Sequence, residues 1–332
     1  IDSLCNRHKV FKRISSTSGT TGTPCFFYRD LLSVITESYF QNRYFEWKNK
    51  YRIVIRADKI FLKDSNSEKI YKKIPFTKEM YVSAYHLNDK GMEYLVDKIK
   101  DIKNKCLWAY PSTAYLLADY CIRNKVELTF DIVATSSESL LLYQLNTIEK
   151  AFGCKVKDWY GLGERVAALY RCESGNYHEV DGYSYVEYIR KYENVYEIVG
   201  TTYYNRVMPL VRYKTGDYVE ISDKPCACGC KGKNITAILG RESDFIDLPS
   251  GKLPGVLLNV IFNKAINIHE TQIVQKRDKS IVVKVVKNHM YTMEDDSILR
   301  NELAKLLAEV KFEVQYVDAL ERNNKFKFIL RE

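Results

Sequence analysis

The sequence of 332 residues lacks several features that define specialised classes of protein. No apolar run approaches the ~20 residues of a membrane span, and no signal peptide opens the chain. There is no internal repeat and no low-complexity tract. The net charge is +9, but basic residues are interleaved with acidic ones instead of forming one run, which argues against a nucleic-acid-binding protein. We therefore expect a globular protein of the cytoplasm whose mild positive charge suits anionic ligands such as ATP.

Helical and strand-like patterns alternate over roughly the first half of the chain, which predicts a layered α/β arrangement. The expected helices are Asp30–Tyr51, Lys90–Lys103, a helix opened by Pro111, and Glu138–Phe152. The expected strands are Tyr51–Leu62, Phe130–Thr135 and Val156–Tyr160. The first helix shows an apolar face made of Leu32, Ile35, Tyr39, Phe40, Tyr44 and Trp47.

The pattern changes after residue 160, where strands predominate and then a small unit follows. The expected strands of the middle region are Gly182–Ile189, Val195–Tyr203 and one within Val207–Ile221. The small unit has the order β-β-α-β, over Thr271–Lys276, Ile281–Val286, Asp295–Val310 and Phe312–Val317. We therefore expect an α/β large domain over residues 1–240, a hinge at 241–245 and a small α+β lid domain over 246–332.

The segment Ser16–Pro24 is the strongest chemical signal in the chain. Its glycines let backbone N–H groups approach an anion, and its hydroxyls add donors to phosphate oxygens. No Gly-Lys-Ser/Thr follows, so this is not a Walker loop. A solvated linker is the alternative, but a linker does not need this ordered string.

Six further motifs occur in the order found in adenylate-forming enzymes. They are Tyr110–Ser112, Thr135–Glu138, Tyr160–Glu164, Arg212–Asp217, Gly240–Asp244 and Asn324–Lys327. Together with the loop, they make the chain resemble the superfamily of acyl-CoA synthetases, luciferases and peptide-synthetase adenylation domains. The branch it resembles most is phenylacetate–CoA ligase with its CapK-like relatives in capsular-polysaccharide clusters, whose loop also lacks a lysine directly after the proline. Members of the family normally carry a longer stretch before the loop, so we expect the large domain here to lack its usual N-terminal part.

The resemblance implies a role for each motif. Phosphate contacts fall to the loop, namely Thr17, Ser18, Gly19, Thr20, Thr21 and Gly22. The rest of the ATP site comprises Ser137, Glu138, Tyr160, Gly161 and Asp217, the last on the ribose hydroxyls. Glu164 would bind Mg²⁺, Arg241 would contact ribose or phosphate, and Lys325 would stabilise the charge on the carboxylate and α-phosphate. Lys327 is a competitor for the last role, and Ser243 stands where the hinge aspartate is expected.

The resemblance also implies the reaction, an ATP-dependent activation of a small carboxylic acid as acyl-AMP followed by transfer to CoA. One alternative is an adenylating enzyme that passes the acyl group to a sugar or amine in surface-polysaccharide synthesis. Another is a truncated, non-catalytic binding module. His86, in the segment Tyr81–Leu87, could face the acid, although packing in a strand is the commoner role. The identity of the acid, the acceptor and the oligomeric state stay open.

The nine cysteines include a group with metal-ligand spacing. Cys172 and His178 form a C-x5-H pair, and Cys226, Cys228 and Cys230 alternate with other residues. Such sets are typical of structural zinc sites, and similar paired cysteines occur in the enzyme branch named above. We expect Zn²⁺ held by Cys172, His178, Cys226 and either Cys228 or Cys230. A metal-free group of reduced thiols is the alternative.

Overall fold

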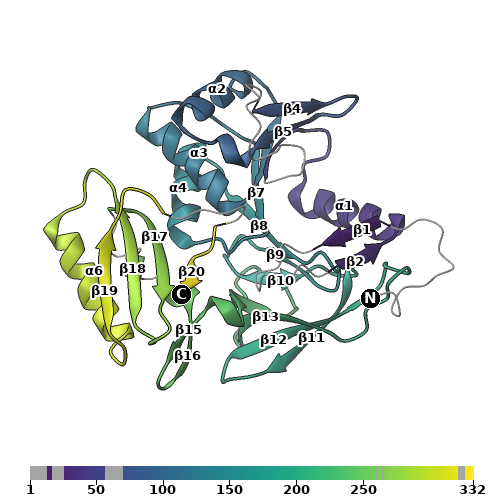
Figure 1. Ribbon diagram of the computed structural model, residues 1–332. Helices are drawn as coiled ribbons and strands as arrows, with labels where there is room; N and C mark the ends of the chain where they lie inside the picture. The colour runs from purple at the N-terminus through teal and green to yellow at the C-terminus, as the bar shows by residue number, and fades with distance from the viewer. Residues whose placement is uncertain are drawn as a thin grey trace. The chain divides into compact units, whose positions relative to one another are not determined.

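The computed structural model describes residues 13–16, 26–56, 70–258, 261–262, 265, 267–320 and 326–332. The main division between two compact units falls between Ile238 and Leu239. This lies close to the predicted boundary at 240–245, which itself stays a prediction. Figure 1 follows the chain from the first unit to the second.

A twelve-stranded sheet organises the first unit, and one half of it is parallel. The parallel strands, in spatial order, are β5 (Glu79–Ser83), β3 (Tyr51–Arg56), β6 (Lys105–Ala109), β7 (Ile132–Ser136) and β8 (Val156–Gly161). Each pairs in parallel with the next, and β4 (Tyr71–Ile74) closes the edge beside β5 in antiparallel orientation. Buried residues predominate in these strands, because helices cover both faces of a parallel sheet.

The other half of the sheet begins where β9 pairs antiparallel with β8. Its strands, outward from β8, are β9 (Ala168–Arg171), β10 (Tyr177–Glu179), β14 (Asn234–Arg241), β13 (Tyr213–Ser222), β12 (Val195–Thr202) and β11 (Ser184–Arg190). The sequence predicted three of these strands and missed β9, β10 and β14, which are short or polar. A separate hairpin of β1 (Arg13–Ser16) and β2 (Phe26–Arg29) flanks the phosphate-loop segment.

Helices cover both faces of the parallel half. Figure 1 shows α1 (Leu31–Phe45) on one side and α2 (Asp89–Ile99) with α3 (Pro111–Arg123) on the other. Pro111 occupies the first helical position of α3, as predicted. The helix α4 (Leu142–Phe152) starts four residues later than predicted, where the Leu141 N–H donates to the side chain of Gln144 in the first turn.

Two predictions about α1 are wrong. The helix ends at Phe45 instead of Tyr51, because Glu46 adopts the left-handed conformation of a C-cap. Its predicted apolar face is wrong for Leu32, Ile35 and Tyr39, which are 39%, 55% and 60% exposed, whereas Phe40 of that face is buried. The buried residues of the helix are Ser33, Glu37, Phe40, Gln41 and Phe45. Periodicity misassigned the face because a buried carboxylate and amide occupy it.

The second unit contains the predicted β-β-α-β order. Its sheet runs β19 (Phe312–Tyr316), β18 (Ile281–Lys287), β17 (Ile268–Gln275), β20 (Ile329–Arg331), and its helix is α6 (Met293–Leu306). The core includes Ile273, Val283, Leu299 and Leu303. The sequence missed β20 and the hairpin of β15 (Phe245–Leu248) with β16 (Gly251–Pro254). Among the described residues of both units, no helix is long and apolar enough to cross a membrane.

Candidate functional site

Two motifs cross where the parallel and antiparallel halves of the first unit's sheet meet. The segment Tyr160–Glu164 leaves the end of β8, and the segment Arg212–Asp217 enters β13. The Tyr160 hydroxyl donates to Asp217 Oδ2 at 2.7 Å, and the Tyr213 hydroxyl donates to Glu164 Oε1 at 3.2 Å. Each motif therefore supplies a carboxylate that a tyrosine of the other motif holds.

Glu164 has the properties of a cation ligand. Its side chain is only 4% exposed, and its Oε2 atom has no hydrogen-bond partner among the described residues. A buried carboxylate oxygen without a partner is costly, and a hard cation is the partner that carboxylate oxygens favour. These features fit the Mg²⁺ ligand that the sequence predicts.

Asp217 is held by its own turn. Gly216 has a φ of 71°, a conformation that glycine adopts without strain, and the Asp217 N–H donates to Thr215 Oγ1 at 3.0 Å. The Thr215 hydroxyl in turn donates to the carbonyl of Ile198 on the neighbouring strand β12 at 2.8 Å. The carboxylate is therefore positioned by backbone and hydroxyl contacts as well as by Tyr160.

A buried ion pair supports this region from α1. Arg165, directly after Glu164, pairs with the carboxylate of Glu37, which also accepts from the Tyr183 hydroxyl and from Gln41. Glu37 is 7% exposed, so the pair is largely removed from water. The sequence analysis missed this network because its members lie far apart in the chain.

The hairpin β1–β2 is also fixed to the Tyr160–Glu164 segment. The Arg29 Nε donates to the Gly163 carbonyl at 2.8 Å. Burial, and next the positive charge of Arg165, lower the pKa of Arg29 to about 10. The predicted phosphate contacts Thr17, Ser18, Gly19, Thr20, Thr21 and Gly22 lie outside the described residues, between the two strands of this hairpin.

The segment predicted to flank adenine lies at the carboxyl edge of the parallel strands. Ser137 directly follows β7 and accepts from Arg56 Nη2 at 2.6 Å. Glu138 Oε2 accepts from the Ser112 N–H at 3.3 Å, in the first turn of α3. Ligands of α/β proteins bind at this edge, so the location suits a nucleotide.

The remaining predicted residues belong to the second unit. The Arg241 N–H donates to Asp244 Oδ2 at 2.8 Å, at the start of a short 3₁₀ turn, η3 (Glu242–Asp244). The carboxylate that fixes this turn therefore belongs to Asp244, one residue after Ser243, which stands where the hinge aspartate is expected. Lys325 lies outside the described residues, and Lys327 accepts a hydrogen bond from Gln272 through its carbonyl.

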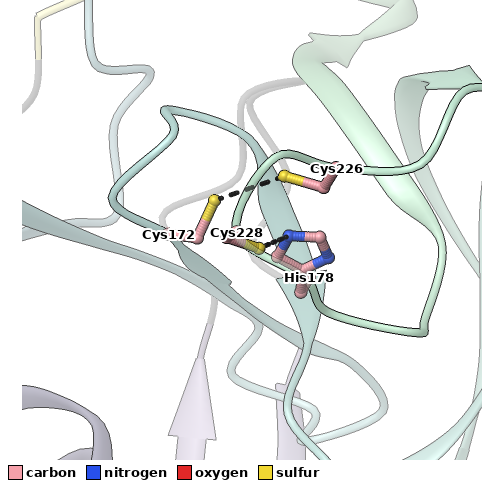
Figure 2. A group of neighbouring side chains, drawn as sticks. All are labelled: Cys172, His178, Cys226 and Cys228. Atoms are coloured by element: carbon pink, nitrogen blue, oxygen red, sulfur yellow. Dashed lines mark hydrogen bonds between the residues drawn. The ribbon is translucent and has the colours of Figure 1, made fainter.

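The Cys/His group forms a compact cluster in the antiparallel half (Figure 2). The ligand atoms of Cys172, His178, Cys226 and Cys228 all lie within 4.8 Å of one another. Cys172 Sγ and Cys226 Sγ are 3.7 Å apart, and Cys228 Sγ is 3.2 Å from His178 Nε2. Tetrahedral zinc with bonds of ~2.3 Å to sulfur places two sulfurs ~3.8 Å apart, so the sulfur spacing fits zinc.

The orientation of His178 also fits a metal ligand. Its Nδ1 lies 3.0 Å from the Lys233 carbonyl, which can only accept, so Nδ1 carries the proton and Nε2 presents its lone pair to the cluster. Although burial opposes it, hydrogen bonds led by the Cys228 backbone lower the pKa of the Cys226 thiol to about 6. Cys230, the alternative ligand, instead interacts with the Tyr170 hydroxyl.

Comparison with known proteins places these sites in a family context. Residues 250–332 match the family model described as the CapK C-terminal domain. Over 324 residues, the chain is 26% identical to Protein CapK from Staphylococcus aureus, a match that covers 94% of this chain and 70% of that protein.

Several solved structures share the fold, and two of those described below are CoA ligases. One is 2-hydroxyisobutyryl-CoA ligase with R3-HIB-AMP in its postadenylation state, with a TM-score of 0.71 at 15% identity, covering 100% of this chain and 74% of that one. Another is ATP-bound MatB from Rhodopseudomonas palustris, with a TM-score of 0.61 at 16% identity and coverage of 93% and 65%. A third is the anthranilate CoA ligase AuaEII with anthranoyl-AMP, with a TM-score of 0.65 at 10% identity and coverage of 95% and 65%.

The chain therefore has the fold of the adenylate-forming ligases, an α/β large domain with a small α+β C-terminal domain, as the motifs predicted. Within that fold, its C-terminal match and its similarity to Protein CapK confirm the resemblance to the CapK-like branch.

Proposed function

We propose that this protein is an ATP-dependent ligase that activates a carboxylic acid as an acyl-AMP. The observation that carries the proposal is the pair of crossed tyrosine–carboxylate bonds, Tyr160 to Asp217 and Tyr213 to Glu164. They hold two buried carboxylates at the carboxyl end of β8, one with an oxygen unpartnered among the described residues. This arrangement supports a site that takes ribose hydroxyls on one carboxylate and a cation on the other.

The chain's own groups would divide the work as follows. Asp217 accepts from the ribose hydroxyls, while the segment Ser137–Glu138 flanks the base. Bound Mg²⁺, held by Glu164, would neutralise phosphate charge during attack by the carboxylate. Lys325 and Arg241 would stabilise the charge that develops as pyrophosphate leaves.

The test is ATP–pyrophosphate exchange across a set of carboxylic acids, together with calorimetric binding of Mg·ATP. Removing a group that stabilises transition-state charge typically costs ~100-fold or more in rate, so we expect such a loss for Glu164→Gln and Asp217→Ala. Glu193→Gln, on an exposed turn, is the control and should match the parent. Mg·ATP affinity within twofold of the parent for Asp217→Ala would contradict the assignment, and absent ATP binding by the parent would favour a non-catalytic module.

The acyl acceptor is proposed to be CoA, since the structural neighbours are CoA ligases. Mass analysis of products with and without CoA tests this step. Consumption of acyl-AMP by an added sugar or amine, with no thioester, would instead support the polysaccharide alternative that the similarity to Protein CapK motivates.

We extend the proposal to a reorientation of the small domain, residues 246–332, about the hinge 241–245. The 2-hydroxyisobutyryl-CoA ligase is known in both postadenylation and thioesterification states. A hinge lets one site run two steps in turn. Limited proteolysis should cut near the hinge, and an acyl-AMP analogue should change the cutting rate. Uniform resistance would count against the motion.

We also propose that the Cys172, His178, Cys226 and Cys228 cluster binds one structural zinc. Its support is the set of four ligand atoms within 4.8 Å and the lone pair of His178 aimed at them. Elemental analysis should give close to one zinc per chain, and Cys226→Ser should abolish it. Cys230→Ser is the matched control and should keep the metal. Metal-free protein with all thiols titratable would mean the cluster is only reduced cysteine. A location in the cytoplasm, where thiols stay reduced, agrees with this proposal.

A further inference from the structure

Arg56 ends the parallel strand β3 at the edge where ligands of α/β sheets bind. Its register partner on β5 is Ser83, so the two residues lie side by side. Ser83 is buried, and its Oγ lies 2.7 Å from Nδ1 of His86. On the other side of β3, Tyr110 directly follows β6 and Ser137 directly follows β7. The guanidinium therefore occupies the middle of a row of polar strand ends.

The guanidinium is held rigidly. Its Cζ lies 4.6 Å from the centroid of the Trp108 ring and 5.2 Å from that of Tyr110. Its Nη2 donates to Ser137 Oγ at 2.6 Å. Trp108 is itself fixed, because its indole N–H donates to Ser136 Oγ at 3.2 Å. Stacking on aromatic faces orients an arginine and leaves its remaining N–H groups in one plane.

The same strand provides a comparison. Arg52 lies four residues earlier on β3, on the same face of the sheet. Its Cζ lies 5.2 Å from the centroid of the Trp47 ring, and its guanidinium pairs with the carboxylate of Glu79 on β5. Arg56 repeats the stacking, but no carboxylate among the described residues pairs with it, and Ser83 occupies the position on β5 that Glu79 has beside Arg52. The sequence thus places a serine where the neighbouring pair has a counterion.

A close contact between α2 and the turn after β5 fixes the position of His86. A Cβ on Gly91, at the start of α2, would lie 1.9 Å from the His86 carbonyl, so only glycine lets this helix approach. The close approach fixes the short turn η2 (Ala84–His86) that carries the imidazole. Arg56 and His86 are then two polar groups that frame one end of the sheet.

We propose that Arg56 is a specificity-determining residue that binds a second carboxylate on the acid substrate, so that the enzyme prefers dicarboxylic acids to aryl or alkyl monocarboxylic acids. This inference rests on the proposed adenylation activity. A planar guanidinium with paired N–H groups matches the geometry of a carboxylate. The hydrogen bond to Ser137 places Arg56 beside the segment proposed to flank the base, which carries no charge. The anion that Arg56 binds is therefore more simply the acid substrate than the triphosphate.

Exchange kinetics with matched acids test the proposal. The pairs are glutarate with pentanoate and succinate with butyrate, measured for the parent, Arg56→Met, Arg56→Lys and the control Arg52→Met. A site built to bond a polar group rejects the analogue that lacks it, so the parent should favour the diacid by at least ~10-fold. Arg56→Met should remove that preference while changing the KM for ATP and the rate with monoacids less than twofold, and Arg52→Met should keep it. Thermal melting of each variant checks folding.

The alternatives give different outcomes. If Arg56 binds the reacting carboxylate, Arg56→Met will slow both members of each pair equally. If it binds a nucleotide or CoA phosphate, the KM for ATP or CoA will rise instead. Either result overturns the proposal, as does a parent that prefers monoacids.

Calorimetric measurement of glutarate binding to the full chain, without ATP, separates this inference from the proposed activity. If no acid supports exchange but glutarate binds the parent and Arg52→Met and not Arg56→Met, the anion site stands and the adenylation proposal fails. If glutarate does not bind the parent and no diacid supports exchange, the inference is wrong.

Discussion

The two halves of the large sheet are built by different means. The parallel half is made of apolar strands under helices, with Ile53, Ile55 and Leu107 fully buried. The antiparallel half has an apolar core of its own, which includes Ile198, Val219 and Ile235, and it adds polar connections, namely the crossed tyrosine–carboxylate bonds and the Cys/His cluster. The candidate nucleotide site lies where they meet. Of its two proposed carboxylates, Glu164 lies on the segment that leaves the parallel strand β8, and Asp217 lies on the antiparallel strand β13.

The largest expected effect comes from removing the metal. If zinc fastens the antiparallel half, a chelator should lower the melting temperature by about 10 °C or more, since metal binding and folding are coupled. Hydrogen exchange should quicken in β9, β10 and β14, while β3, β6 and β7 keep their protection. A chelator should not lower the melting temperature of Cys226→Ser further. Equal loss of protection in both halves would contradict the prediction that the metal stabilises the antiparallel half and not the parallel half.

The next largest effect concerns the ion pair beneath Glu164. Glu37→Ala leaves the Arg165 guanidinium buried without its partner, which should lower the free energy of unfolding by about 3–5 kcal/mol. Asp131→Ala removes only an exposed pair with Lys50 and should change it by less than ~1 kcal/mol. Urea unfolding measures both. A loss for Glu37→Ala no greater than the control's would mean that α1 does not stabilise this region.

Asp158 ties the two halves together and should make stability depend on pH. This fully buried carboxyl on β8 accepts from Thr135 on β7 and from Tyr177 on β10. Burial raises its pKa from 3.8 to about 6, against the effect of those two hydrogen bonds. A raised pKa means that the protonated form is favoured in the folded state, so the carboxyl's contribution is present below pH ~4 and is lost as the pH rises through 6.

The shift corresponds to about 3 kcal/mol. Relative to Asp158→Asn, the parent should therefore lose about that much stability between pH 4 and 7, measured as the difference between their urea unfolding free energies. Other titrating groups cancel in this difference. A constant difference over the range would show that Asp158 does not change its proton affinity on folding.

The smallest effect belongs to the parallel half alone. Asn88 caps α2, and its Oδ1 accepts from the Gly91 N–H at 2.9 Å. Asn88→Ala should cost about 1 kcal/mol, while Asn88→Asp should keep the cap. Hydrogen exchange of α2 would register the change, and β9 and β10 should not respond. A response in those strands would mean that the two halves unfold as one unit.

How far the sequence predicted the structure depends on whether the signal was local. The α/β character, Pro111 at the start of α3, and the small unit's β-β-α-β order were local and were read correctly, although β4, β5 and β6 were not predicted. The face of α1 was partly wrong, because Glu37 is buried against Arg165 and Tyr183, which are distant in the chain. The strand β20 was missed because three residues gain a strand conformation only by pairing with β17.

The same distinction applies to the site. The resemblance to family motifs identified Glu164 and Asp217, and metal-ligand spacing identified the Cys/His group with Cys228 or Cys230 as its last member; the functions of all of them remain predictions. Arg56 had no such signal, because its significance comes from Trp108, Tyr110 and Ser137 on neighbouring strands. Arg52 differs from it in pairing with Glu79, whereas no carboxylate among the described residues pairs with Arg56.

The crossed bonds have a consequence for synthesis on the ribosome. Tyr160 leaves the ribosome 57 residues before Asp217, and Glu164 leaves 49 residues before Tyr213. During that interval β8 can pair with β7 and the parallel half can form, but neither carboxylate can be held. A nascent chain halted before β13 would therefore present a helix-covered sheet with an unfinished edge, and the crossed bonds would form only after β13 and then β14, which lies between β13 and β10, have emerged.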